Sequence, residues 1–166
     1  MDIIEIKFKQ HNPYGCGIYA VANALDFSTY ITEARLEQSK SGGTIQQLNN
    51  WLDEDGHNFH IDTIYYDCNN LLPDNWDVIP LGESDCLPIL LKIQGKSLDH
   101  MISVHVFNNG ELYIHDSLKQ QVLKTNWTNL KGFYKEIRGV YAFKSNDPKI
   151  CDYMIMMPEA TVKYYL

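Results

Sequence analysis

The chain has few cysteines, and they form no pattern typical of a metal site or of a disulfide framework. The four are Cys16, Cys68, Cys86 and Cys151, and no two of them form a Cys-x-x-Cys pair. A zinc site would need ligands gathered from scattered positions. A chain of 166 residues is also long enough to bury a core without disulfide staples. We therefore predict reduced thiols, a cytoplasmic location and no metal site.

Long apolar runs and an excess of positive charge are also missing. No apolar stretch approaches the ~20 residues of a membrane span. The first ten residues, MDIIEIKFKQ, lack the basic start and long apolar run of a signal peptide. The formal net charge of −7 disfavours general binding to nucleic acid or to an anionic membrane. Because no Gly-rich phosphate loop is present, the sequence also predicts no cofactor.

What remains is an ordinary globular composition, 45% hydrophobic and 21% charged, with no repeat or linker. We expect one domain over residues 1–166. Helical spacing of apolar residues predicts a helix over 18–25, and a second short helix is expected over 32–38. A third is predicted after Thr44, because Thr44 and Gln47 have the spacing of a capping box.

From residue 57 onward the hydrophobic period changes to two, which is typical of strands. Strands are expected in NFHIDTIYY, LPILLKI, HMISVHVF, ELYIHDS, GVYAFKS and DYMIMM, a short helix in WTNLKGFYKEI, and an opening strand in MDIIEIKFKQ. HMISVHVF and ELYIHDS flank Asn-Asn-Gly, a strong hairpin signal. Helices early and antiparallel strands late predict an α+β fold.

Cys16 lies between two glycines where the first predicted helix begins. A thiol with an ordinary pKa of ~8.5 is a weak nucleophile at neutral pH, and the unpaired N–H groups of a helix start lower that pKa. Gly15 and Gly17 allow a tight turn and the close approach of a substrate backbone. A cysteine at a helix start can also be a small buried hydrophobe. The assignment of Cys16 as a nucleophile therefore depends on its companions.

A general base for this thiol can come from the predicted hairpin, which carries three of the six histidines and ends at Asp116. With a three-residue Asn-Asn-Gly loop, Ile102 faces Asp116, and His100 becomes the diagonal neighbour of Asp116. With a two-residue Asn-Gly loop, Asp116 faces Ser103, and His105 takes that position. The turn alone leaves both registers open.

Gln10, Cys16, His100 and Asp116 together resemble the papain-like cysteine peptidases, and most closely the bacteriocin-processing, double-glycine peptidase family. In that family a Gln and a short turn precede the Cys-Gly that opens the central helix. Here Gln10 lies six positions before Cys16. The segment LPILLKIQGKSLDHMISVHVFNNGELYIHDS is similar to the family's strand, its His at the head of a hairpin and its Asp at the end. The family's spacing favours His100 over His105.

The resemblance covers about residues 8–145, and it implies the papain-like α+β fold. The segment 146–166 has no counterpart and is expected to be a C-terminal extension. Ser117 follows Asp116 where the family usually has proline. His105 and His115 are expected to be structural, and the three cysteines other than Cys16 to be buried thiols.

The resemblance implies a cysteine peptidase that hydrolyses a peptide bond, with preference for small residues such as Gly-Gly before the cut. Cys16 would be the nucleophile, His100 the base, Asp116 its orienting group and Gln10 the donor to the oxyanion. The residues expected to contact the substrate are Gly15, Gly17 and Asp99.

Other functions use the same fold and stay open at this point. The same triad can cleave a ubiquitin-like tail as an isopeptidase, or pass the acyl group to an amine as a transferase. A catalytically inactive member would be a binding module, although such members typically lose the Cys or the His, and this chain keeps all four site residues. In each case the expected partner is a protein or peptide, and the sequence predicts no oligomeric state.

Overall fold

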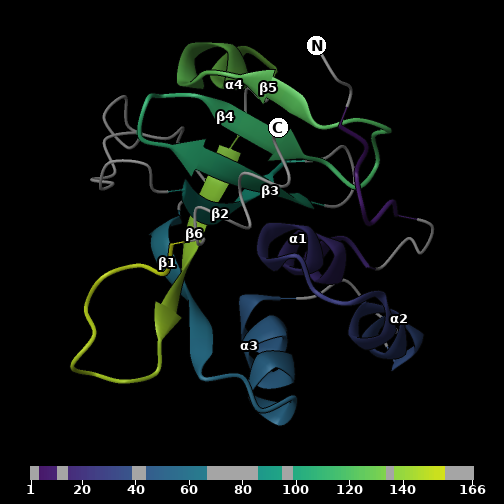
Figure 1. Cartoon of the computed structure of the whole chain (residues 1–166), viewed down its shortest axis with the longest axis vertical. Coiled ribbons are helices and arrows are strands. Elements are labelled where there is room, and N and C mark those ends of the chain that lie inside the picture. Colours follow the sequence, from purple (N-terminus) through teal and green to yellow (C-terminus); the bar gives the residue numbers. More distant parts are fainter. Residues whose placement is uncertain are drawn as a thin grey trace.

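The computed structural model describes residues 4–10, 15–38, 44–66, 86–94, 99–133 and 137–155 (Figure 1). The helices in this part of the chain are α1 (Cys16–Leu25), α2 (Thr29–Gln38), α3 (Ile45–Glu54) and α4 (Trp127–Phe133). The strands are β1 (Phe59–Tyr66), β2 (Cys86–Ile93), β3 (His100–Phe107), β4 (Leu112–His115), β5 (Leu123–Thr125) and β6 (Ile137–Ser145). No helix among the described residues is long and apolar enough to cross a membrane.

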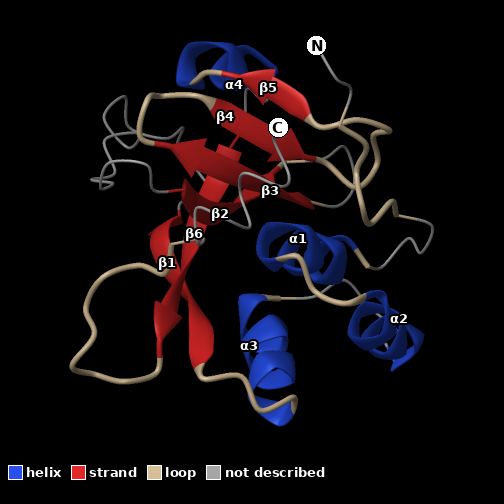
Figure 2. Cartoon of the chain, in the orientation of Figure 1, coloured by secondary structure: helices blue, strands red, loops and turns tan. Residues whose placement is uncertain are grey.

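The described strands form one antiparallel sheet in the order β1-β6-β2-β3-β4-β5. Strand β2 is central and almost wholly buried, as its continuous apolar sequence predicts. The first three helices gather beside one face of the sheet (Figure 2). The α+β class predicted from the sequence is confirmed.

Two hydrophobic clusters hold these layers together, one on each face of the sheet. The first packs α1, α2 and α3 against the sheet, and its members include Val21, Leu36, Leu48, Trp51, Leu52, Leu90, Met101 and Phe143. The second lies under α4 and includes Leu87, Ile89, Leu91, Ile102, Val104, Ile114, Leu130 and Val140. Since α1 packs on β3, the two elements that carry Cys16 and His100 lie against each other.

The β3–β4 hairpin has a three-residue loop. Phe107 N donates to Glu111 O at 3.0 Å, and Gly110 takes the positive φ of +87° that such loops require. The paired residues are Ser103–His115, Val104–Ile114, His105–Tyr113 and Val106–Leu112. Continued by one residue, this register sets Asp116 opposite Ile102, which is the first of the two registers left open by the sequence.

Helix α3 begins as predicted, because Thr44 and Gln47 form both hydrogen bonds of the capping box. The opening strand expected over residues 1–10 is wrong within its described part. Residues 4–10 form instead an N-terminal strap that makes a single bridge, between Glu5 and Gln121. Its Phe8 is held by two hydrogen bonds to the side chain of Asn23 in α1, both 3.1 Å long.

The last described segment, 146–155, is also less regular than the sequence predicts. The strand expected in DYMIMM is reduced to one bridge, between Tyr153 and Lys144, and residues 156–157 lie outside the described residues. Strand β5, which pairs with β4 at the edge of the sheet, has no counterpart among the predicted elements.

Candidate active site

Cys16 is the first residue of α1, and the local structure leaves the helix start open to its sulfur. Gly15 is the N-cap residue and supplies no side-chain cap, and the first turn carries no acidic residue. The backbone N–H groups of a helix start need an acceptor. The N–H of Gly17 helps to lower the pKa of the Cys16 thiol, which is half-buried.

His100, the first residue of β3, is held by a buried carboxylate. Its Nε2 lies 2.8 Å from Oδ1 of Asp116, a residue that is only 5% exposed. The same oxygen accepts a hydrogen bond from the backbone N–H of Leu118 at 3.0 Å. Because the Leu118 N–H holds the carboxylate of Asp116 in place, Asp116 can fix the orientation of the imidazole.

The side chains of Cys16 and His100 interact, and each shifts the pKa of the other. Burial by itself raises the pKa of the Cys16 thiol, but hydrogen bonds from His100 and from the backbone of Met101 and Gly17 outweigh it and lower the pKa. Burial by itself lowers the pKa of His100, but Asp116 and Cys16 together raise it to about 9. Both shifts favour a thiolate–imidazolium pair near neutral pH.

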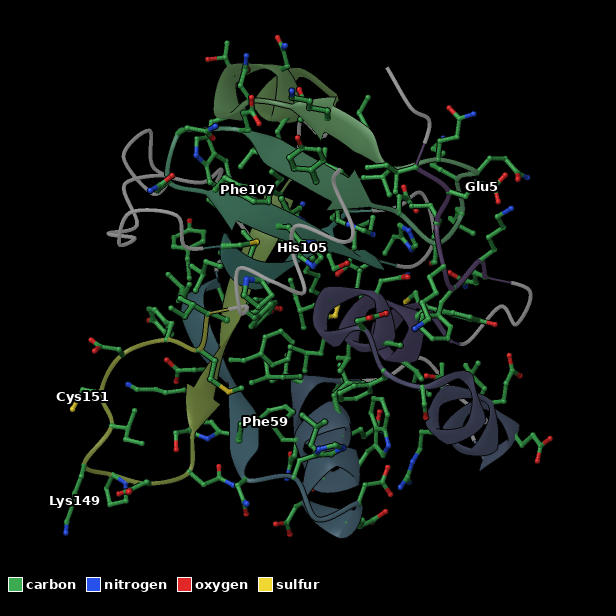
Figure 3. All side chains as sticks on the ribbon, viewed as in Figure 1. Glu5, Phe59, His105, Phe107, Lys149 and Cys151 are labelled. Carbon is green, nitrogen blue, oxygen red and sulfur yellow. The ribbon has the colours of Figure 1, made fainter. Side chains whose placement is uncertain are left out.

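His105, the competing histidine, lies elsewhere. It is 1% exposed, and its Nε2 lies 3.0 Å from the carbonyl oxygen of Ala24 in α1. Figure 3 shows it on the sheet, pointing toward α1. Burial lowers the pKa of His105 to about 4 and that of the neighbouring His115 well below its usual value; the two ring centroids are 4.6 Å apart. The structure therefore brings Cys16 and Asp116 to His100 and places His105 in the core.

Gln10, at the end of the N-terminal strap, is joined to the turn that follows Asp116. Its backbone N–H donates to Ser117 O at 2.6 Å, and its Oε1 accepts a hydrogen bond from Ser117 Oγ at 3.0 Å. The sequence alone does not predict this hydroxyl partner. The only signal for it in the sequence is the residue type at position 117.

Gly15 and Gly17 are buried, and a side chain at either position would press against its neighbours. A Cβ on Gly15 would lie 2.7 Å from Leu36 Cδ2 and 2.8 Å from Tyr19 Cε2. A Cβ on Gly17 would lie 3.2 Å from Leu48 Cδ1. These distances give the two glycines a structural reason that the sequence did not reveal.

Asp99, the remaining expected substrate contact, lies next to His100 and is exposed. Its carboxylate forms an ion pair with Lys92 Nζ at 3.6 Å. Lys92 in turn lies over the ring of Tyr66, with Nζ 5.4 Å from the ring centroid. A charged and aromatic surface therefore adjoins the start of β3.

The other cysteines divide into different environments. Cys86 is 1% exposed, as expected for a buried thiol. Cys151 is exposed instead, because it lies on the extended segment after β6 and points away from the body of the molecule (Figure 3). Cys68 lies outside the described residues. Within the described ranges, no group of three or more His, Cys, Asp or Glu side chains could hold a metal ion.

No family model matches the chain, and no curated protein matches it in sequence. Among solved structures, the chain is similar to the peptidase domain of Streptococcus ComA, a bi-functional ABC transporter involved in a quorum sensing pathway. The two structures align with a TM-score of 0.51 at 20% sequence identity, over 86% of this chain and 96% of that chain. At this identity the likeness concerns the fold, which is that of a peptidase domain of the kind the sequence resembles.

Proposed function

We propose that the chain is a cysteine peptidase in which Cys16 is the nucleophile, His100 the acid–base group and Asp116 its orienting partner. One observation carries the proposal: the imidazole of His100 is hydrogen-bonded to the buried carboxylate of Asp116 and interacts with the thiol of Cys16 at a helix start. Nucleophile, base and orienting group in series are what covalent acyl-transfer chemistry requires. The likeness in fold to a peptidase domain supports the same conclusion.

The proposed reaction begins with the thiolate–imidazolium pair. The Cys16 thiolate attacks the carbonyl carbon of the scissile bond, and the π electrons move to the carbonyl oxygen. Because Nε2 of His100 is engaged with Asp116, its Nδ1 is the nitrogen that exchanges a proton with the reacting groups. Collapse of the tetrahedral intermediate breaks the C–N bond, and Nδ1–H protonates the leaving amine.

Hydrolysis of the thioester completes the cycle. Water attacks the acyl carbon while neutral His100 takes one of its protons, and the C–S bond breaks to release a carboxylic acid. The thiolate–imidazolium pair is thereby restored. In both tetrahedral intermediates the negative oxygen would accept hydrogen bonds from the Gln10 side chain and from the Cys16 backbone N–H, which has no partner inside the helix.

The proposed substrate is a protein or peptide with small residues, such as Gly-Gly, before the cut. Contacts are proposed at Asp99, which is exposed beside His100, and at the backbone of Gly15 and Gly17 on either side of the nucleophile. The organisation of residues 1–166 as one domain also remains a prediction.

Hydrolysis of a peptide library rich in Gly-Gly sequences tests the proposal. We expect the parent protein and a Cys151→Ala control to cleave such peptides, and Cys16→Ala to be inactive. Amide products formed only with an added amine acceptor would indicate an acyl transferase. Absence of any turnover in the parent would contradict the peptidase proposal and favour a binding module.

A further inference from the structure

The turn after β4 contacts both halves of the proposed catalytic machinery through adjacent residues. Asp116 binds the imidazole of His100 at 2.8 Å, and the next residue, Ser117, donates its hydroxyl to Gln10 Oε1 at 3.0 Å. One short segment therefore reaches the base and the oxyanion donor together. The contact of Asp116 with His100 orients the base of the proposed reaction. The contact of Ser117 with Gln10 joins the proposed oxyanion donor to the same turn.

We propose that Ser117 is a positioning residue that sets the orientation of the Gln10 carboxamide for oxyanion binding. The proposal rests on the function proposed above and deepens it. A terminal amide rotates about a broad, roughly two-fold torsion, so its oxygen and nitrogen ends can exchange places at little intrinsic cost. An oxyanion is stabilised by the N–H end and repelled by the oxygen end.

The Ser117 hydroxyl distinguishes these two orientations. As a donor it pairs with the amide oxygen, so the Nε2 end of Gln10 turns away from Ser117. In the flipped orientation, the hydroxyl would face an NH₂ group and would have to accept a hydrogen bond from it instead. The observed hydrogen bond therefore selects the orientation in which the donor end is directed away from the turn.

The backbone around this hydrogen bond gives it a fixed frame. Ser117 is 4% exposed, so water competes little for its hydroxyl. Its carbonyl oxygen accepts the backbone N–H of Gln10 at 2.6 Å, and further along, Ile6 N donates to Gln120 O at 3.1 Å. The N-terminal strap and the turn thus run side by side, and the conformational freedom that remains to Gln10 is that of its side chain.

The test compares two reactions of Cys16, only one of which forms an oxyanion. Ser117→Ala should lower kcat for a Gly-Gly peptide about five- to twentyfold with little change in KM, as expected for loss of one hydrogen bond that supports an oxyanion donor. Alkylation of Cys16 by iodoacetamide should be unchanged, since it forms no oxyanion. A merely structural role would alter both reactions.

Three further variants sharpen the comparison. Ser117→Thr keeps a hydroxyl and should restore most of the lost kcat. The double variant Gln10→Ala/Ser117→Ala should be no slower than Gln10→Ala alone, because the hydroxyl acts only through the amide. Ser145→Ala, the control, removes a remote serine hydroxyl that accepts the N–H of Asp147, and it should leave kcat unchanged.

The outcomes separate this proposal from the function on which it rests. If Gln10→Ala lowers kcat and Ser117→Ala does not, the positioning role is overturned while the peptidase proposal stands. If the parent cleaves no peptide, the peptidase proposal fails, and ¹⁵N relaxation of the Gln10 side-chain amide decides the positioning claim. That amide should become more mobile in Ser117→Ala, and equal mobility in the two proteins would overturn the claim.

Discussion

Burial and the two partners of His100 shift the pKa of its imidazole in opposite directions. Burial disfavours its charged form, whereas Asp116 and Cys16 both stabilise it, and the partners raise its pKa to about 9. A pKa shifted by burial and by specific charged partners is common at functional sites. The cation in turn helps to keep the Cys16 thiol ionised below its ordinary pKa.

Removing the imidazolium of His100 should therefore lower the reactivity of the Cys16 thiol. We expect His100→Ala to reduce the rate at which iodoacetamide alkylates Cys16 at about pH 6 by at least about tenfold, because less thiolate is present. The control is His60→Ala, which removes an imidazole in β1 whose Nδ1 lies 2.8 Å from Asn146 Oδ1. Equal rates in the two variants would mean that His100 does not activate the thiol.

Several features at the residue scale could be read directly from the sequence, and others could not. The glycines and the helix start single out Cys16 in the sequence, and the place after the hairpin singles out Asp116. Their assignment to one site with His100 and Gln10 comes from the family resemblance and stays a prediction. For Gly15 and Gly17 the sequence indicates the close approach of a substrate, whereas the structure shows packing against Leu36 and Leu48. The Ser117–Gln10 hydrogen bond joins segments far apart in the chain, so no local pattern could predict it.

At the scale of elements, the packing of α1 explains why its first turn is rich in glycine. A methyl group on Gly15 would collide with the ring of Tyr19, which is 1% exposed and has little room to move. Among the described residues, nothing beyond the adjacent residues and the backbone of α4 lies within 4 Å of the corresponding position on Gly132. The two glycines therefore form a matched pair for substitution.

We expect Gly15→Ala to destabilise the protein by about 1–3 kcal/mol through overpacking. Gly132→Ala should be neutral or stabilising by up to about 1 kcal/mol, because alanine favours a helix over glycine. Urea unfolding of the two variants and the parent measures both effects. A Gly15→Ala protein as stable as the parent would mean that α1 does not pack tightly against Tyr19.

Elements with strong local signals were predictable. The capping box of α3 and the buried run of β2 depend on contacts within one segment or on composition alone. The hairpin was predictable but its register was not, because Asn-Asn-Gly fits loops of two lengths, and only the pairing of Phe107 with Glu111 decides between them. The alternation in residues 1–10 gave a wrong strand, because the strap packs by hydrogen bonds to α1 and to the turn rather than in the sheet.

At the scale of the whole molecule, the fold buries two histidines that must stay neutral. His105 and His115 lie on the face of the sheet that α1 covers, with ring centroids 4.6 Å apart. Burial lowers the pKa of His105 to about 4 although the Ala24 carbonyl and Asp26 oppose the change, and burial also lowers the pKa of His115. The native state therefore binds fewer protons than the unfolded chain between about pH 6.5 and pH 4.

Stability conferred by these histidines is fully present above pH 6.5, the ordinary histidine pKa, and is lost as the pH falls toward about 4. For His105 alone, the loss between about pH 6.5 and pH 5 is on the order of 2 kcal/mol. We expect the urea midpoint to fall over this range, and to fall less in His105→Asn, which cannot be protonated. An equal fall in parent and variant would assign the acid sensitivity to other groups.

The assembly of the candidate site is also a property of the whole molecule. Cys16 belongs to a helix, His100 to a strand, and Asp116 to a turn, and only the packing of α1 on β3 brings the first two together. In the sequence, only the resemblance to a known family groups these residues into one site. Periodicity identifies the faces of helices and strands, but it does not say how one end of a helix meets one end of a strand.

The central claim, that Cys16 is an activated nucleophile, is tested most directly by brief labelling with iodoacetamide at about pH 6, followed by mapping of the modified cysteine. The labelling rate of Cys16 is compared with that of Cys151, because Cys151 is exposed whereas Cys16 is half-buried. Accessibility alone predicts that Cys151 reacts first. Activation by His100 predicts instead that Cys16 reacts first, and that this preference is lost after unfolding or in His100→Ala. Faster modification of Cys151 in the folded parent protein would contradict the claim.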